Sequence, residues 1–188
     1  MTIPRLEQEQ LPPNVAAMLA PRIKRLGYLG EFFKCAAHQP DALVSFMAFT
    51  EDLKHALPDR ITEVVALTVS TALENAYERH QHERLCLKLG FGEEWIRAVE
   101  DRARDATHGD DRSAKLSAER EHERLVQDLT LAVLHRHGKH TTRELDAASA
   151  AIGHEQAIGV LMLIGRYVTH ALIVNALDLA PPVPSPLA

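Results

Sequence analysis

Two acidic residues and one histidine are spaced in this sequence so that they could share one proton-transfer site. Glu78 and His82 are four residues apart in a segment with helical spacing, which places both side chains on one face of a helix. Glu63 lies in the apolar segment just before it. A carboxylate orients an imidazole and raises its basicity, and two carboxylates in a sheltered pocket have pKa values that are pushed apart. The pattern therefore indicates acid–base chemistry by Glu63, Glu78 and His82.

The same spacing also fits two other interpretations. Glu78 and His82 could form an ordinary surface pair, worth about 0.2–0.5 kcal/mol, with Glu63 stabilising the start of its own helix. Spacing alone favours this structural interpretation, because it does not show whether Glu63 reaches His82. The three residues could also hold a divalent cation as a carboxylate–histidine set. Of these interpretations we do not favour the metal site. We also expect no organic cofactor, since no nucleotide or phosphate-binding motif is present.

The elements that must position these residues are predicted to be helices throughout. Aromatic residues make up only 5% of the 188 residues, and alanine and leucine are abundant, which favours helix over strand. Periodicity and breakers place helices at about residues 14–26, 28–37, 41–57, 60–73, 75–89, 93–104, 117–137, a short one from 141, and 156–177. Asp59 and Ser117 are predicted N-caps, and Thr141 to Glu144 is a predicted capping box.

Two of these helices are expected to be central. Residues 60–73 are apolar almost all round, as a fully packed helix would be. Residues 156–177 are long enough to cross a membrane, but Arg166, His170 and Asn175 would be costly there. We therefore predict a buried core helix, within a single all-α domain over residues 1–180. Residues 105–115 are predicted to be a polar linker, and the proline-rich residues 181–188 an extended tail draped on a partner subunit.

The bulk composition excludes several classes of partner. A net charge of −5 gives no electrostatic attraction to nucleic acid or to an anionic membrane. Cys35 and Cys86 match no zinc or redox spacing, so reduced thiols in a cytoplasmic protein are expected. The first ten residues lack the pattern of a signal peptide.

The motifs Leu57–Arg60, Glu63, Tyr77–Glu78 and His82 together resemble the carboxymuconolactone decarboxylase-like family, which includes alkyl hydroperoxidase D. Later segments resemble the same family in order and spacing: residues 123–129, 138–144, 164–168 and 175–177. The resemblance covers about residues 10 to 180. It implies a bundle of about eight or nine helices that assembles as a homo-oligomer (a dimer, trimer or hexamer), with a site near the subunit contacts.

The sequence departs from the hydroperoxidase branch of that family at its reactive thiols. There a glutamate is followed by a Cys-x-x-Cys pair and then by a histidine, which the resemblance maps to Glu63 and His82. The two cysteine positions are then Asn75 and Glu78, so both thiols are absent. A peroxidatic cycle needs a thiolate and a resolving thiol. Cys86 lies one turn past His82 without a resolving partner in sequence, so peroxidase activity is disfavoured.

The leading functional prediction is therefore a cofactor-free acid–base enzyme of the decarboxylase or isomerase type, acting on a small organic acid or lactone. In this prediction His82 transfers protons, Glu78 orients it or acts as a second acid or base, and Glu63 tunes the pair. The alternatives are a thiol-dependent hydroperoxidase and a non-enzymatic binding or assembly protein on the same scaffold. The predicted substrate-binding residues are Arg60, Tyr77 and Arg166.

Overall fold

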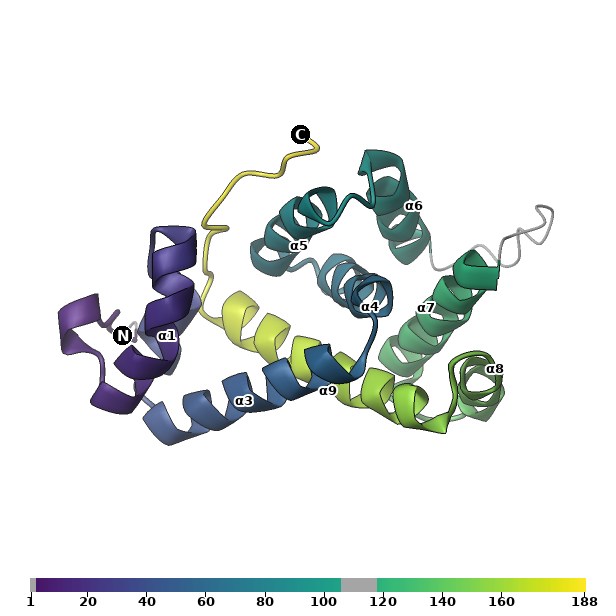
Figure 1. Ribbon diagram of the computed structural model, residues 1–188, viewed down its shortest axis with the longest axis horizontal. Coiled ribbons are helices and arrows are strands. Elements are labelled where there is room, and N and C mark those ends of the chain that lie inside the picture. The colour runs from purple at the N-terminus through teal and green to yellow at the C-terminus, as the bar shows by residue number, and fades with distance from the viewer. Residues whose placement is uncertain (1–2, 106–117) are drawn as a thin grey trace.

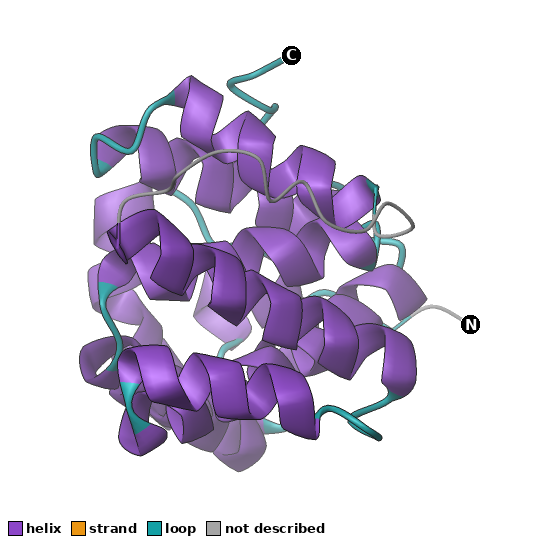
Figure 2. Cartoon of the chain, turned by 90° about the vertical axis from the view of Figure 1, so that its right-hand side faces the viewer, coloured by secondary structure: helices purple, strands orange, loops and turns teal. Residues whose placement is uncertain are grey.

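The computed structural model describes residues 3–105 and 118–188, and every regular element in these two ranges is helical, as predicted (Figures 1 and 2). The elements are η1 (Gln8–Gln10), α1 (Pro13–Leu26), α2 (Glu31–Ala36), α3 (Pro40–Ala56), α4 (Asp59–Ala72), α5 (Ala76–Lys88), α6 (Glu93–Arg104), α7 (Ala118–Arg136), α8 (Thr142–Ile152) and α9 (His154–Ala176). Most of the predicted linker and the predicted cap Ser117 lie outside the described residues.

Helix α4 forms the centre of the bundle. It packs against α5, α6, α7 and α9, which surround it in Figure 1. All eleven residues from Ile61 to Thr71 are buried, because the helix is apolar almost all round. The prediction of a central helix here is confirmed. Any polar side chain on α4 is therefore removed from water and needs a partner inside the protein.

A second apolar cluster lies on the N-terminal side of this core. It joins α1, α2 and α3 to the C-terminal part of α9, with Val15, Leu19, Phe32 and Met47 among its buried residues. Helix α9 contributes to both clusters, because Leu163 and Tyr167 pack in the core around α4 and Val174 in the N-terminal cluster. Helix α5 also contributes to both, with Cys86 in the core around α4 and Tyr77 in the N-terminal cluster.

Helix α9, the candidate membrane span of the sequence, is packed into this bundle. By length and composition it could cross a membrane, with a mean hydropathy of 1.8 over its most apolar window. Ten of its residues are buried, among them the polar Arg166 and His170, and it packs against α3, α4, α7 and α8. The predicted core helix is confirmed.

Two predicted helix starts are wrong in detail. Asp59 is the first helical residue, because the N-cap position is taken by Pro58. Thr141 does precede α8, but its hydroxyl donates to the carbonyl of Gly138 at 3.3 Å and caps no amide of α8. Glu144 does not complete a capping box because it forms ion pairs with two arginine side chains. At α8 the side chains of the predicted capping box are thus engaged by other partners.

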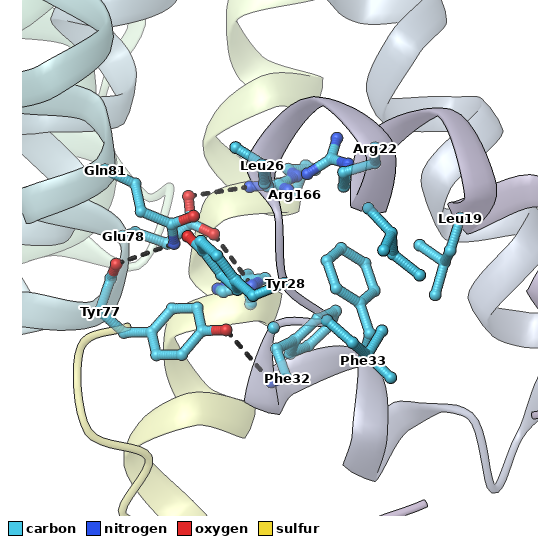
Figure 3. A pocket seen from close by; sticks show the side chains of 14 residues that line it. Leu19, Arg22, Leu26, Tyr28, Phe32, Phe33, Tyr77, Glu78, Gln81 and Arg166 are labelled. Carbon is cyan, nitrogen blue, oxygen red and sulfur yellow. Dashed lines mark hydrogen bonds and ion pairs between the residues drawn. The ribbon is translucent and has the colours of Figure 1, made fainter. Parts of the chain in front are cut away.

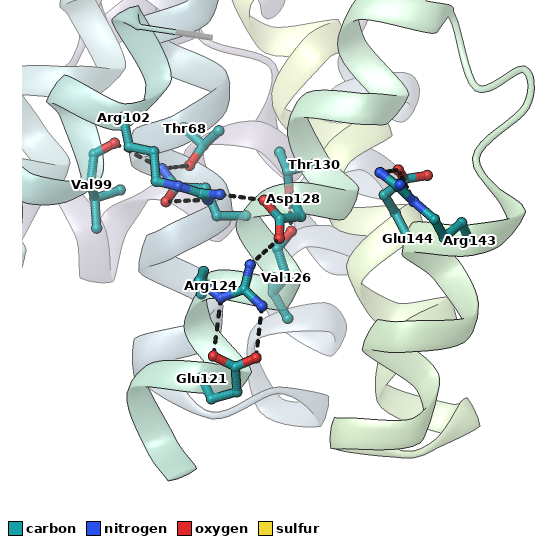
Figure 4. Close-up of polar contacts among 11 residues, drawn as sticks. Thr68, Val99, Arg102, Glu121, Arg124, Val126, Asp128, Thr130, Arg143 and Glu144 are labelled. Atoms are coloured by element: carbon teal, nitrogen blue, oxygen red, sulfur yellow. Dashed lines mark hydrogen bonds and ion pairs between the residues drawn. The ribbon is translucent and has the colours of Figure 1, made fainter. Parts of the chain in front are cut away.

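Polar contacts fix α7 against its neighbours (Figure 4). The buried amide of Gln127 donates to the hydroxyl of Thr68 at 3.1 Å and to the carbonyl of Val99 at 2.8 Å, which ties α7 to α4 and α6. Nearer the surface, Asp128 accepts from Arg102 and Arg124. The α4–α7 packing is thus specified by hydrogen bonds as well as by apolar contact.

The C-terminal tail is not helical, with bends at residues 182–183 and a turn at 186–187, and it lies along α5 and α6 of its own chain (Figure 1). Its backbone carbonyls at Pro184 and Leu187 accept hydrogen bonds from Arg84 at 3.2 Å and Arg97 at 2.9 Å. The hydroxyl of Ser185 donates to the buried Glu83. The tail is thus held by contacts within its own chain, and its predicted contact with a partner subunit stays a prediction.

Candidate active site

The site is built where the start of α5 docks on α4. Asn75 is the N-cap of α5, and its side-chain oxygen accepts the amide of Glu78 at 3.2 Å. This cap places Glu78 in the first helical turn, where the helix dipole favours a negative charge. Asn75 and Glu78 are the two positions where the hydroperoxidase resemblance expects cysteines. Here they start the helix and supply a carboxylate.

Four side chains from three helices form one hydrogen-bonded chain. His82 Nδ1 lies 2.6 Å from Glu63 Oε2, and His82 Nε2 lies 3.0 Å from Glu78 Oε2. The second oxygen of Glu78, Oε1, lies 2.9 Å from His170 Nε2 on α9. Glu63, Glu78 and His82 are 2%, 8% and 6% exposed. The interpretation as an ordinary surface pair is therefore wrong, and the predicted convergence of the three residues is present.

His82 is the positive centre of this chain. Burial alone would lower the pKa of its imidazole, but the Glu63 and Glu78 carboxylates on its two nitrogens raise the pKa to about 9. At neutral pH both ring N–H groups therefore donate to carboxylates. An imidazolium held in this way has no free lone pair, so it is a fixed cation between two acids.

The protonation states of Glu78 and His170 also follow from burial and neighbouring charges. Burial would raise the pKa of the Glu78 carboxyl, but His170, Arg166 and the hydrogen bond from His82 hold it well below its usual range. Burial lowers the pKa of His170 despite the opposing effect of Glu78. At neutral pH His170 is thus a neutral imidazole that donates Nε2–H to an ionised Glu78. Its support of Glu78 at that pH is a hydrogen bond rather than a charge.

Arg166 adds a second positive charge next to Glu78. Its Nε donates to the hydroxyl of Thr50 on α3 at 3.0 Å, and its Nη1 lies 3.8 Å from Glu78 Oε2, beyond hydrogen-bond reach. The guanidinium lies over the rings of Tyr167 and Phe46, with centroid distances of 4.4 and 5.2 Å. Only 6% of Arg166 is exposed. Its orientation is therefore fixed by packing and by one hydrogen bond.

A narrow pocket opens onto the Glu78 side of this chain, between α1, α2, α5 and α9 (Figure 3). Glu78, Tyr77, Arg166 and His170 line it, whereas Glu63 and His82 do not. Glu78 thus separates His82 from the pocket. The other lining residues are mostly apolar: Leu19, Arg22, Ile23, Leu26, Tyr28, Leu29, Gly30, Phe32, Phe33 and Gln81.

Tyr77 shapes the floor of the pocket. Its hydroxyl accepts the amide of Phe32 at 3.2 Å, which links α5 to the start of α2. A Cβ atom on Gly30 would lie 2.8 Å from that hydroxyl, so a larger residue at this position would displace the Tyr77 hydroxyl from the Phe32 amide. The placement of Tyr77 and Arg166 in the pocket wall agrees with the predicted substrate-binding role, which stays a prediction.

Arg60 is not brought to this pocket. Its guanidinium pairs with the carboxylate of Glu123 on α7 and lies 4.9 Å from the ring centroids of both Phe91 and Trp95. Trp95 Nε1 donates to the same carboxylate at 2.8 Å. Arg60 therefore has a packed structural environment that joins α4, α6 and α7.

The sequence interpretation missed His170 as a member of the site. It was expected to be a hydrogen-bonded core histidine, and it is one, but its partner is the central carboxylate Glu78. Thr50 and Arg22 were also not anticipated. The available signal was that Arg166 and His170 are four residues apart on one predicted helix, which places them on one face.

The thiols lie in unreactive environments. Cys86 is fully buried, with its Sγ 3.5 Å from Glu63 Oε2, and burial together with that carboxylate raises the pKa of the thiol. Cys35 belongs to the N-terminal cluster, and both cysteines are free. Within residues 3–105 and 118–188 no group of three histidine, cysteine or acidic side chains is arranged to hold a metal ion.

The structure therefore defines an all-α bundle with a buried carboxylate–histidine chain at the wall of a pocket. Comparison with protein families gives one match. Residues 40–118 match the model of the carboxymuconolactone decarboxylase family, which supports assignment of the chain to this family. The matched segment contains α3 to α6 and therefore Glu63, Glu78 and His82. No curated protein sequence matches the chain.

Several solved structures share the fold at low sequence identity. One is an uncharacterised peroxidase-related protein with an alkylhydroperoxidase AhpD core from Ralstonia eutropha JMP134, with a TM-score of 0.74, 18% identity, and coverage of 95% of this chain and 90% of that one. The debrominase Bmp8, as a Cys-to-Ala variant in complex with 2,3,4-tribromopyrrole, has a TM-score of 0.73, 15% identity, and coverage of 96% and 91%. A putative antioxidant defence protein AhpD from Agrobacterium tumefaciens has a TM-score of 0.63, 17% identity, and coverage of 79% and 96%. At these identities the likeness shows the fold alone.

Proposed function

We propose that this protein is a cofactor-free acid–base enzyme, of the decarboxylase or isomerase type, that acts on a small organic acid or lactone. The observation that carries the proposal is the buried Glu63–His82–Glu78 chain ending at the wall of a pocket that also contains Arg166. Decarboxylation and isomerisation of such compounds both place negative charge on an oxygen in the transition state. A fixed cation beside a proton-transfer group is what that chemistry needs.

The residues divide into those at the pocket and those behind it. Arg166 anchors an anionic group or stabilises the charge that develops, and protons pass between substrate and protein at Glu78 or at the His170 hydrogen-bonded to it. His82 and Glu63 lie behind Glu78 and act as positioning residues, because the imidazolium keeps Glu78 ionised and fixed in place. The sequence-based role of His82 as the group that itself transfers protons stays a prediction.

The family and the structural neighbours are compatible with more than one chemistry. The matched family is named after a decarboxylase, whereas the structural neighbours include peroxidase-related proteins and a debrominase. For a thiol mechanism the only cysteine near the site is Cys86. It is fully buried and its pKa is raised, so little nucleophilic thiolate is available. This observation favours the acid–base proposal over the hydroperoxidase alternative.

Turnover tests separate these functions. A panel of β-keto acids and unsaturated lactones is incubated with the full chain and a metal chelator, without thiols, and CO2 release and double-bond migration are followed. We expect turnover that falls by about 10²–10⁴-fold in Glu78→Gln. Glu94→Gln, which changes an exposed acid on α6, is the matched control and should leave the rate unchanged. Circular dichroism confirms that each variant is folded.

Other outcomes would replace the proposal. Consumption of peroxide with a dithiol donor, abolished by Cys86→Ser, would establish the thiol-dependent activity instead. Absence of turnover across the panel, together with tight binding of an organic acid, would establish a binding protein on this scaffold.

A further inference from the structure

Two residues that line the pocket each have a buried polar atom without a hydrogen-bond partner within the described residues. The atoms are Nη1 of Arg166 and Nδ1 of His170, which lie one turn apart on α9. Both side chains line the pocket, and they are 6% and 2% exposed. A buried polar atom without a hydrogen bond costs about 1–3 kcal/mol, and such an atom in a pocket indicates a group that a ligand must supply.

The two atoms have opposite hydrogen-bonding character. Arg166 Nη1 can only donate, because a guanidinium has no acceptor. His170 donates through Nε2 to the ionised Glu78 at 2.9 Å, so in the neutral ring Nδ1 carries the lone pair and can only accept. Burial keeps His170 neutral despite Glu78, and the positive charge of Arg166 acts in the same direction as burial. A ligand that satisfies both atoms has an acceptor oxygen for Arg166 and a donor for His170.

The charged groups around His170 support this assignment of a neutral His170 ring that accepts through Nδ1. Helix α5 contributes Glu78 and the His82 cation behind it, α9 contributes Arg166, and α1 contributes Arg22 at the pocket. Glu78 is already engaged by His82 and His170. An added negative charge therefore meets the two arginines, whereas a proton donor meets His170.

The remaining wall restricts the rest of the ligand. The ring of Phe32 lies against His170 with a centroid distance of 4.1 Å and an interplanar angle of 36°. Phe33, Leu19 and Leu26 extend this apolar surface (Figure 3). The closed cavity holds only about 20 Å³, so a ligand enters only when α1 and α2 move away from α5 and α9. A flat unsaturated or aromatic body suits the side chains that then line the opening, since apolar and stacking contacts replace hydrogen bonds.

We infer that the pocket recognises flat, unsaturated carboxylic acids that also carry a hydroxyl group, with the carboxylate on Arg166 and the hydroxyl donating to His170 Nδ1. Hydroxyaryl acids and enol acids are the chemical class. This inference rests on the proposed function, because it names the substrate class of the same site. It also makes His170 a residue that touches the substrate. In an enol acid the hydroxyl proton passes to Nδ1 as the enolate oxygen forms, and it returns to carbon or oxygen when the product leaves.

Binding of simple probes tests the inference without any turnover. Isothermal titration calorimetry at pH 7 compares 3- and 4-hydroxybenzoate with 3- and 4-methoxybenzoate and with benzoate, using the full chain. We expect at least one hydroxybenzoate to bind about 10–100-fold more tightly than its methoxy counterpart, because only the hydroxyl satisfies Nδ1. His170→Phe should reduce that ratio to about one, and Arg166→Gln should weaken binding of all the benzoates.

The control variant is His55→Gln, an exposed histidine on α3 outside the pocket, which should retain the wild-type ratio. Because His170→Phe removes a buried hydrogen bond and could unfold the protein, a second readout uses the wild type. In nitrogen-15 spectra of histidine-labelled protein, the unprotonated Nδ1 signal of His170 should move when the better hydroxybenzoate binds and stay when benzoate binds.

Three outcomes overturn the inference: equal affinity for the hydroxy and methoxy compounds, no binding by any member of the panel, or a His170 ring that carries its proton on Nδ1. Its failure can be told apart from failure of the proposed function. Turnover of a lactone or β-keto acid with an affinity ratio of one would refute only the inference. The expected ratio without turnover of any substrate would refute only the proposed enzyme activity.

Discussion

The imidazolium of His82 should make the stability of this protein depend on pH in a defined window. In the folded protein burial opposes protonation, but Glu63 and Glu78 raise the pKa from 6.5 to about 9. A group whose pKa is raised by folding contributes stability that is fully present below pH 6.5 and is lost as the pH rises through about 9. At 1.36 kcal/mol per pKa unit this contribution is about 3 kcal/mol.

The perturbation that reveals this contribution is His82→Gln, measured by urea unfolding at pH 6 and at pH 10. At pH 6 the variant lacks the cation between two buried carboxylates, and at pH 10 the wild type has lost it too. The difference in unfolding free energy between wild type and variant should therefore shrink by about 3 kcal/mol from pH 6 to pH 10. Titration of tyrosine and lysine side chains affects both proteins and cancels in the difference.

The exposed histidine of α3 provides the control, because His55→Gln should shift the stability curve equally at both pH values. A His82→Gln difference that is the same at pH 6 and pH 10 would refute the reasoning. It would mean that folding does not raise the pKa of His82 and that the ring is not held as a cation between the two acids.

Three further predictions concern other parts of the bundle. Leu67→Ala, in the centre of α4, should lower the unfolding free energy by about 2–5 kcal/mol in urea titrations, whereas Leu172→Ala on the exposed face of α9 should change it by less than about 1 kcal/mol. Equal effects at the two sites would contradict the assignment of α4 as the core. Arg60→Met should destabilise the fold by about 1–3 kcal/mol by leaving Glu123 without its ion pair, but should leave binding of benzoates unchanged in calorimetry. Weaker binding without destabilisation would restore the predicted substrate role of Arg60. Cys86 should react with a water-soluble thiol reagent only under unfolding conditions, and rapid labelling of this thiol in the native protein, followed by mass spectrometry, would reopen the redox interpretation.

The helices could be predicted from the sequence because their signals are local. Proline at the start of α1 and α3 and the continuous apolar surface of α4 indicate position and burial without reference to the rest of the chain. The ends were less predictable, since caps depend on competing partners. Thr141 had the residue type of a cap, but its hydroxyl bonds to the preceding turn.

The site was predictable only in its local part. Glu78 and His82 follow from a four-residue helical spacing, whereas the contact of His82 with Glu63 requires α5 to dock on α4. The contact of Glu78 with His170 joins segments that are distant in sequence, so no spacing rule could indicate it. For Arg60 the local signal was misleading. Its position three residues before Glu63 suggested that it binds substrate, but in the structure its guanidinium packs between the rings of Phe91 and Trp95.

The two walls of the pocket differ in how firmly the fold holds them, and this has a consequence for how ligands enter. One wall is carried by α5 and α9, which pack on the core helix α4, and we expect the amides of α4 to be among the slowest in the protein to exchange with deuterium. The facing wall rests on α1 and on the six-residue α2, which are not part of the core around α4. Local opening of α1 and α2 should therefore admit ligand while the charged groups keep their geometry. Deuterium uptake should then be slowed by a bound ligand in α2 and remain unchanged in α4.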